Sequence, residues 1–187
     1  MRIVILASGT GTLLQSVIDN VDRSRVEIAA VGSDRQCAAL DRAERAGIEH
    51  FLVEYVPKQT FRDKWNEELA DKLASYQPDL VVSAGFMRII GPTVVERFEG
   101  KIINTHPALL PAFPGAHAVE DALDYGVRVT GSTVHVVDSG VDTGPIIAQK
   151  AVEVADDDTV DSLHERIKKV ERALLVEVLH DIAGTTD

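Results

Sequence analysis

The sequence is poor in cysteine and in positive charge, and it has no long hydrophobic run. Its single cysteine, Cys37, excludes an intrachain disulfide and a metal site built from cysteines. No apolar run approaches the roughly 20 residues that cross a membrane. The apolar segment 1–7 is too short for the hydrophobic region of a signal peptide and favours a buried first strand. These absences predict a cytoplasmic protein with no membrane partner.

Basic residues are outnumbered, since 19 Lys and Arg face 30 Asp and Glu and give a formal net charge of −11. Such a charge argues against binding to nucleic acid or to an anionic membrane. It leaves room for a small anionic ligand, because a few local donors can outweigh the mean field of the protein. The six histidines show no paired spacing typical of a metal site, so we expect no metal.

What the sequence does contain is a regular alternation of strand and helix patterns. With 187 residues, 45% of them hydrophobic, the chain is long enough for one domain with a sizeable core. The predicted strands cover residues 3–7, 26–32, 48–53, 80–82 and 101–104. A first helix is predicted to begin near residue 13, and three more are predicted over residues 37–46, 61–76 and 92–98. This alternation predicts an α/β fold with a doubly wound, mostly parallel, Rossmann-like sheet.

The pattern changes after residue 108. A short helix is expected near residues 119–123, followed by two longer strands over residues 127–137 and 145–154. We expect these two strands to pair antiparallel at one edge of the sheet. Apolar residues at helical spacing from Leu163 to Val178 mark one face of a long last helix. No repeat or linker divides the chain, so residues 1–187 are predicted to form a single domain.

A glycine loop, Gly9-Thr10-Gly11-Thr12, separates the first predicted strand from the first helix. Backbone N–H groups at the start of a helix, together with threonine hydroxyls, can hold a phosphate. The loop is not a dinucleotide fingerprint, because Leu14 takes the position of the third glycine, and it lacks the Gly-Lys-Ser/Thr of a P-loop. By itself the loop fits phosphate binding and a plain tight turn equally well.

Asn104 and His106 lie at the carboxyl end of the fifth predicted strand, where ligands bind in doubly wound sheets. Alternate side chains of a strand point to the same side, so the amide and the imidazole should face one site. The pair suits acyl transfer, because an amide can stabilise an oxyanion and an imidazole can act as acid or base. Taken alone, the pair fits a structural asparagine and a core histidine equally well.

Asp142 lies in the turn-prone segment 138–144, between the two long predicted strands. A carboxylate beside an imidazole stabilises its protonated form and fixes its orientation. Standing alone, Asp142 fits an aspartate that caps a turn better than a catalytic residue. No Gly-x-Ser-x-Gly motif indicates the nucleophile of a hydrolase.

Together, six motifs resemble the glycinamide ribonucleotide formyltransferase family over nearly the whole chain. The motifs are ASGTGT (7–12), AGFMRII (84–90), NTHPALLP (104–111), FPG (113–115), GSTVH (131–135) and DTGPI (142–146). The resemblance implies the formyltransferase fold and transfer of a formyl group from 10-formyltetrahydrofolate to the amine of 5′-phosphoribosylglycinamide in de novo purine biosynthesis. It also implies direct attack by the amine, with neither a metal nor a covalent enzyme intermediate, and a homodimer.

Carried over by position, the resemblance implies three sets of site residues. The implied catalytic residues are Asn104, His106 and Asp142. The implied ribonucleotide-binding residues are Gly11, Thr12, Leu13, Lys168 and Glu171. The implied residues for binding the formyl folate are Arg62, Met87, Arg88, Ile89, Ile90, Asn104, Asp138, Ser139, Gly140, Val141 and Asp142. The amino-terminal half would therefore bind the ribonucleotide, and the carboxyl-terminal half would bind the folate and carry catalysis.

The chain departs from this pattern at Leu13, where many relatives have asparagine, so one side-chain contact to the ribonucleotide is missing while backbone donors remain. Many relatives also continue past the last helix.

Two other functions stay open. A 10-formyltetrahydrofolate deformylase could use the same three catalytic residues, although such relatives usually carry an additional amino-terminal regulatory domain. A non-catalytic nucleotide-binding module would use the glycine loop and leave the three catalytic candidates unexplained.

Overall fold

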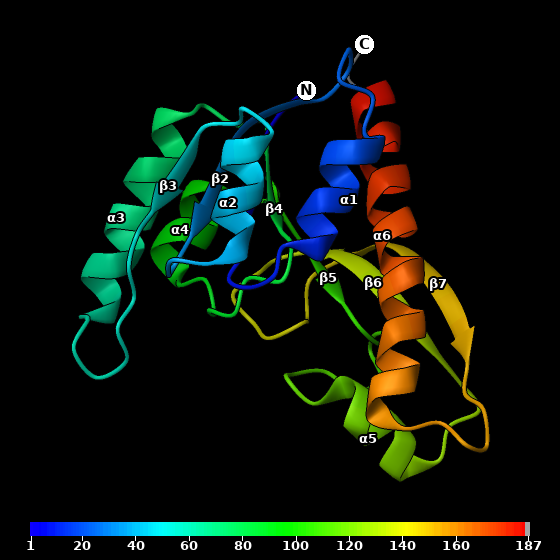
Figure 1. Cartoon of the computed structure of the whole chain (residues 1–187). Helices are drawn as coiled ribbons and strands as arrows, with labels where there is room; N and C mark the ends of the chain where they lie inside the picture. The colour runs from blue at the N-terminus through cyan, green and yellow to red at the C-terminus, as the bar shows by residue number, and fades with distance from the viewer. Residues whose placement is uncertain (186–187) are drawn as a thin grey trace.

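A computed structural model describes residues 1–185, and its seven strands form one sheet in the order β3-β2-β1-β4-β5-β6-β7 (Figure 1). The strands are β1 (Arg2–Leu6), β2 (Glu27–Ser33), β3 (His50–Leu52), β4 (Leu80–Ser83), β5 (Ile102–His106), β6 (Val129–Val136) and β7 (Ile146–Glu153). The helices are α1 (Thr12–Asn20), α2 (Ala38–Arg45), α3 (Arg62–Ser75), α4 (Pro92–Arg97), α5 (Ala118–Tyr125) and α6 (Val160–Gly184).

The first five strands pair in parallel, and β6 and β7 complete the sheet as an antiparallel edge. The predicted doubly wound, mostly parallel sheet with an antiparallel edge is thereby confirmed. The ends of the elements differ from the predicted ranges by a few residues. β3 is shorter than predicted, and β5 extends to His106, so that Asn104 and His106 both stand within one strand.

Helices cover both faces of the sheet, which is why β1 is apolar at successive positions. Ile3 and Ile5 pack in a core cluster with residues of α1, α2 and α6. Val4 and Leu6 point to the opposite face, where they pack with residues of α3 and α4. Successive side chains of a strand alternate between the two faces, so a strand covered on both sides needs an unbroken apolar run.

The long helix α6 packs beside α1 on one face of the sheet (Figure 1). This packing brings the start of α1, and the glycine loop before it, close to the middle of α6. Buried leucines from both helices, Leu13 and Leu14 of α1 and Leu174 and Leu175 of α6, belong to the same core cluster. Among residues 1–185, no helix has both the length and the apolar character that crossing a membrane requires.

Candidate active site

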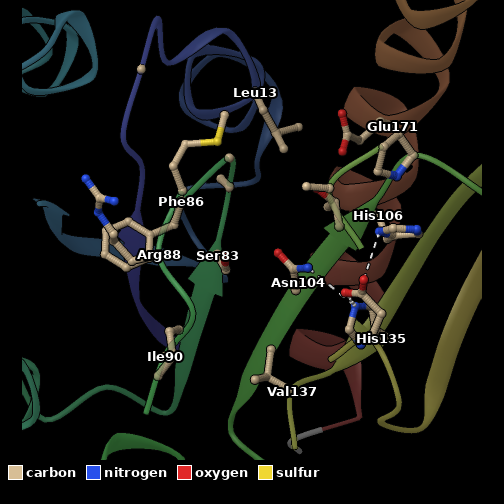
Figure 2. Close-up of a pocket in the computed structure, with 18 of the residues that line it drawn as sticks. Leu13, Ser83, Phe86, Arg88, Ile90, Asn104, His106, His135, Val137 and Glu171 are labelled. Carbon is tan, nitrogen blue, oxygen red and sulfur yellow. Dashed lines mark hydrogen bonds and ion pairs between the residues drawn. The ribbon is translucent and has the colours of Figure 1, made fainter. Parts of the chain in front are cut away.

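A cavity of about 740 Å³ opens at the carboxyl ends of β1, β4 and β5. The strand order reverses here, because β2 continues from β1 on one side and β4 lies on the other, and such switch points are where doubly wound sheets bind ligands. The loops after these strands, the segment 138–142 and one face of α6 line the cavity (Figure 2). Every predicted site residue lines it except Arg62 and Ser139.

The carboxylate of Asp142 joins three segments at the wall of this cavity. Its Oδ2 lies 3.4 Å from Nδ1 of His106, and its Oδ1 lies 3.6 Å from Nε2 of His135 (Figure 2). The backbone N–H of Gly115 also donates to Oδ2, at 2.8 Å. Both histidines are nearly fully buried. The structure therefore brings the predicted pair Asp142 and His106 into contact and adds His135 to it.

Both ring nitrogens of His106 face acceptors. Nε2 lies 2.7 Å from the carbonyl oxygen of Phe113, which can only accept a hydrogen bond, and Nδ1 faces the Asp142 carboxylate. The imidazolium form, which carries a proton on each nitrogen, satisfies both contacts at once. The surroundings of His106 therefore suit a proton donor.

Asn104 and His135 stand directly opposite each other in the antiparallel pair of β5 and β6. Nδ2 of Asn104 lies 3.4 Å from Nε2 of His135, while Nδ1 of His135 lies 2.9 Å from the carbonyl oxygen of Val136. Because that carbonyl accepts, Nδ1 carries the proton, and Nε2 can accept from the Asn104 amide. One amide N–H is thus held by His135, and the second remains for a ligand.

Three features of the segment 138–144 shape the turn that carries Asp142. The backbone of Asp142 is left-handed, with φ of 55°, a conformation that aspartate adopts more readily than most residues. A Cβ at Gly144 would lie 1.8 Å from the carbonyl oxygen of Val136, so only glycine fits the return into β7. Asp138 accepts a hydrogen bond from the Thr143 hydroxyl at 2.7 Å, which lowers the pKa of Asp138 and closes the turn.

The glycine loop places backbone donors of α1 at the cavity wall. Gly11 precedes the helix with φ of 69°, and a Cβ there would lie 2.8 Å from the Cα of Ala39 in α2. Nε of Arg42 donates to the carbonyl oxygen of Thr10 at 2.7 Å and holds the loop against α2. The N–H groups in the first turn of a helix have no partner within the helix, so those at the start of α1 can hold an anion.

Three lysine or arginine residues line the cavity, and they differ in how they are paired. Nε of Arg88 donates to the buried Asp34 at 2.8 Å, and Nζ of Lys168 donates to Glu165 at 2.8 Å. The guanidinium of Arg172 has no hydrogen bond or ion pair with any other residue between 1 and 185. Arg172 is therefore the lining cation best placed to bind an anionic ligand.

Glu171 is a partly buried carboxyl group on the face of α6 that lines the cavity (Figure 2). Burial raises the pKa of Glu171, and a hydrogen bond with Thr105 and the charges of Arg172 and Lys168 oppose this rise. A ligand that brings a hydrogen-bond donor or a positive charge would stabilise the ionised form of Glu171, which burial disfavours.

The segment 87–90 offers backbone groups to the opposite side of the cavity. The N–H of Met87 donates to Oγ of Ser8 at 2.8 Å, and Nη2 of Arg62 donates to the carbonyl oxygen of Ile89 at 2.6 Å. Arg62 therefore shapes this wall from outside the cavity. The N–H groups of residues 88, 89 and 90 have no hydrogen-bond partner among residues 1–185, and those at positions 88 and 90 are the two that we assign to a ligand.

Sequence reasoning assigned no role to His135, His164 or Arg172, which also line the cavity. His135 stands in the GSTVH motif, but its contact with Asn104 depends on the register of β5 and β6, which no local pattern gives. His164 and Arg172 lie four residues before and after Lys168, and this spacing on one helix could have indicated them. Within residues 1–185, no three His, Cys, Asp or Glu side chains form a group that could hold a metal ion.

Comparison with known proteins shows the family of the chain. Residues 1–179 match the model of a family described as formyl transferase. The chain is 53% identical over 183 residues to phosphoribosylglycinamide formyltransferase of Mycobacterium tuberculosis, covering 97% of this chain and 85% of that protein. It is 38% identical over 188 residues to the Bacillus subtilis enzyme of the same name, covering 98% of this chain and 95% of that protein.

Solved structures give the same result. The fold is similar to that of glycinamide ribonucleotide transformylase 1 from Symbiobacterium toebii, with a TM-score of 0.92 and 40% identity, over 99% of this chain and 88% of the other. It is also similar to phosphoribosylglycinamide formyltransferase from Bacillus halodurans, with a TM-score of 0.90 and 38% identity, over 100% of this chain and 97% of the other.

The raised pKa of Glu171 predicts how stability responds to pH. Folding favours the protonated carboxyl, so its contribution is present at low pH and is lost as the pH rises through the folded-state pKa. Glu171→Gln removes this loss. We expect the free energy of unfolding of the variant to exceed that of the unsubstituted protein by a margin that grows from about pH 4 to about pH 8, measured by urea unfolding.

Glu165→Gln is the matched control, because Glu165 is an exposed carboxyl on the same helix whose pKa is lowered by Lys168. Its margin over the unsubstituted protein should not grow with pH. Parallel pH profiles for Glu171→Gln and the unsubstituted protein would contradict the assignment.

Proposed function

The chain belongs to the formyl transferase family, and from that premise we propose the reaction that its cavity carries out. The protein is an enzyme that transfers a formyl group from a folate-type donor to the amine of 5′-phosphoribosylglycinamide, a step of purine biosynthesis. We take the donor to be 10-formyltetrahydrofolate.

The observation that carries this proposal is the meeting of Asn104, His106 and Asp142 at the wall of one cavity. The imidazole of His106 faces the partly buried carboxylate of Asp142 from a distant loop, and the Asn104 amide of the same strand contacts His135, which lies beside that carboxylate. Such a group provides hydrogen-bond donors for an oxyanion and a residue that holds or moves a proton. These are the functions that acyl transfer between two nitrogens requires.

The proposed reaction is a direct attack. The lone pair of the glycinamide amine attacks the formyl carbon, and the electrons of the carbonyl double bond move to its oxygen. The free N–H of Asn104 and the protonated His106 stabilise this oxyanion, while Asp142 orients His106. When the intermediate collapses, the carbonyl re-forms and the bond to the folate nitrogen breaks. The proton lost by the amine reaches that nitrogen through His106 or a water molecule.

The contact between His106 and the carbonyl of Phe113 bears on this step. Nε2 of His106 donates there at 2.7 Å, so it must exchange this acceptor for the formyl oxygen when the donor binds. In this proposal the contact between the Asp142 carboxylate and Nδ1 of His106 is kept while Nε2 changes its acceptor. The Phe113 carbonyl thus holds the proton donor ready until a better acceptor arrives.

We place the ribonucleotide between the start of α1 and the middle of α6. Its phosphate is bound by the backbone of Gly11, Thr12 and Leu13, because the apolar side chain of Leu13 has no group that could form a hydrogen bond with it. The unpaired Arg172 supplies a positive charge that the backbone cannot. Glu171 and Lys168 bind the rest of the ribonucleotide, with Glu171 at its amine-bearing arm.

We place the pterin ring of the donor between the segments 87–90 and 138–142. The free N–H groups at positions 88 and 90 hydrogen-bond the polar edge of the ring, while Ile90 and Val141 cover its faces. Ser139 lies outside the cavity, and Arg62 acts through the carbonyl of Ile89. Both substrates are small molecules and share one cavity, which suits direct transfer.

The organisation of the chain around this cavity stays a prediction. We propose that residues 1–187 act as one formyltransferase domain in which both halves of the chain contribute to each substrate, because Lys168 and Glu171 lie in the carboxyl-terminal half and the segment 87–90 lies in the amino-terminal half. The homodimer and the cytoplasmic location also remain predictions.

An assay for loss of 10-formyltetrahydrofolate, with and without the glycinamide ribonucleotide, tests the proposed function. Consumption that depends on the ribonucleotide and yields its formyl derivative supports transfer. Consumption at the same rate without the ribonucleotide would instead identify a deformylase, and binding of the ribonucleotide with no consumption would identify a non-catalytic module.

Loss of either polar catalytic side chain should slow the chemical step. Asn104→Ala removes an oxyanion donor, and Asp142→Ala removes the group that orients His106, so each should lower kcat on the order of a hundredfold or more. The KM values should change little. Near-normal turnover by either variant in the same assay would contradict the assignment.

Gly11→Ala should act on binding of the ribonucleotide. The added Cβ would meet Ala39 at 2.8 Å, and φ of 69° strains any L side chain, so the loop must move away from its phosphate-binding position. We expect the dissociation constant for the ribonucleotide, measured by calorimetry, to rise by about tenfold or more, with a smaller effect on kcat. Gly126→Ala is the control, because Gly126 also has a positive φ, of 81°, but does not line the cavity. Unchanged affinity in Gly11→Ala would exclude the role of this loop.

A further inference from the structure

Asp34 is a fully buried carboxyl group that the proposed reaction does not use. It follows β2 directly and does not line the cavity. A buried carboxylate is costly unless hydrogen bonds and opposite charges surround it. The hydrogen-bond partners of Asp34 therefore indicate its structural role.

The partners of Asp34 come from the ends of three neighbouring strands. Oδ1 accepts a hydrogen bond from the hydroxyl of Ser8, which follows β1. Oδ2 accepts from Nε of Arg88, in the segment after β4, at 2.8 Å, and from Nη2 of the adjacent Arg35 at 3.1 Å. Burial by itself raises the pKa of Asp34, but these hydrogen bonds outweigh it and lower the pKa, so the group is ionised near neutral pH.

The hydroxyl of Ser8 passes this contact on to the backbone of the segment 85–90. Oγ of Ser8 donates to Asp34 and accepts from the N–H of Met87 at 2.8 Å. The N–H of Ser8 donates to the carbonyl oxygen of Gly85 at 3.1 Å. Asp34 is therefore tied to this segment twice, through Ser8 at Met87 and directly at Arg88.

The other end of the same segment is held from α3. Arg62 donates to the carbonyl of Ile89, and Oδ1 of Asn66 accepts from the N–H of Gly91 at 2.8 Å. The free N–H at position 88 lies at the Asp34 attachments, and the free N–H at position 90 lies between the two attachments to α3. Losing the Asp34 side would leave this stretch of backbone held at one end.

We propose that Asp34 is a positioning residue for the binding of the formyl donor, because it fixes the backbone of residues 87–90 through Ser8 and Arg88. The inference rests on the proposed function, in which this backbone reads the pterin edge. Asp34 touches neither substrate. Its removal should therefore weaken binding of the donor while leaving the catalytic group around Asp142 intact.

Asp34→Asn is the sharpest test, because the two side chains have the same shape and differ in what they accept. An amide oxygen turned toward the arginines puts NH₂ against Ser8, whose hydroxyl then loses its acceptor. The reverse orientation puts NH₂ against two guanidinium groups. In the first orientation the hydrogen of the Ser8 hydroxyl loses its acceptor, and in both orientations the charge-assisted pairing with Arg88 is lost. Asparagine therefore weakens the attachments at Met87 and Arg88.

We expect Asp34→Asn to raise KM for 10-formyltetrahydrofolate by about tenfold, as for a buried hydrogen-bond partner left unpaired. Its kcat should stay within about threefold, and the dissociation constant for the ribonucleotide should stay within about twofold. A role in folding alone would not separate these three constants. An unchanged KM for the donor, or an equal loss of affinity for both substrates, would overturn the proposal.

Two further variants complete the test. Arg35→Ala removes another guanidinium from the same carboxylate without touching the segment 85–90, so its KM for the donor should match that of the unsubstituted protein. Ser8→Ala cuts the relay to Met87 but leaves the Asp34–Arg88 pair, and it keeps the test open if Asp34→Asn folds poorly. It should also raise KM for the donor, and the double variant should raise it by less than the product of the two effects.

The role of Asp34 and the proposed reaction are tested by different measurements. Whether the unsubstituted protein forms the formylated ribonucleotide tests the reaction. Direct binding of 10-formyltetrahydrofolate to Asp34→Asn and Arg35→Ala, measured by calorimetry, tests the positioning role whichever way the reaction assay turns out. Equal affinity in these two variants would refute the role of Asp34.

Discussion

The contact on which the site depends is the one between the Asp142 carboxylate and the imidazole of His106. It joins the end of β5, in the parallel part of the sheet, to the loop between the two antiparallel strands. The antiparallel edge brings β6 and its following loop back to β5, so that a residue distant in sequence can reach His106. The same carboxylate accepts from the N–H of Gly115 and lies close to His135. One partly buried carboxylate therefore contacts residues on both sides of the strand that carries Asn104.

Much of this arrangement could be predicted from the sequence, for reasons that differ between the fold and the site. The continuous apolar run of β1 predicts a strand buried on both faces, and the helices that bury it give the parallel sheet. The strand ends then place Asn104 and His106 at the edge where ligands bind. The catalytic role of Asp142 could be predicted only through the family resemblance, because no local sequence pattern distinguishes a catalytic aspartate in a loop from one that caps a turn.

The remainder depends on contacts that no local pattern encodes. His135 faces Asn104 because of the register of β5 with β6, and a shift by one residue would turn it to the other face. The carbonyl of Phe113 meets His106 because Phe113 is left-handed, with φ of 52°. The pairing of Arg88 with Asp34 could not be predicted from the sequence either, and it neutralises one of the cations that line the cavity. Of the lysine and arginine side chains that line the cavity, Arg88 is paired with the buried Asp34 and Lys168 with the exposed Glu165, while Arg172 has no ion pair among residues 1–185.

The central claim is that both substrates occupy this one cavity together and that the formyl group passes directly between them. Initial rates measured over a grid of donor and ribonucleotide concentrations test it most directly. Direct transfer within a ternary complex predicts double-reciprocal lines that intersect. Parallel lines would contradict the account, because they would show that the formyl group rests on the enzyme between two separate half-reactions.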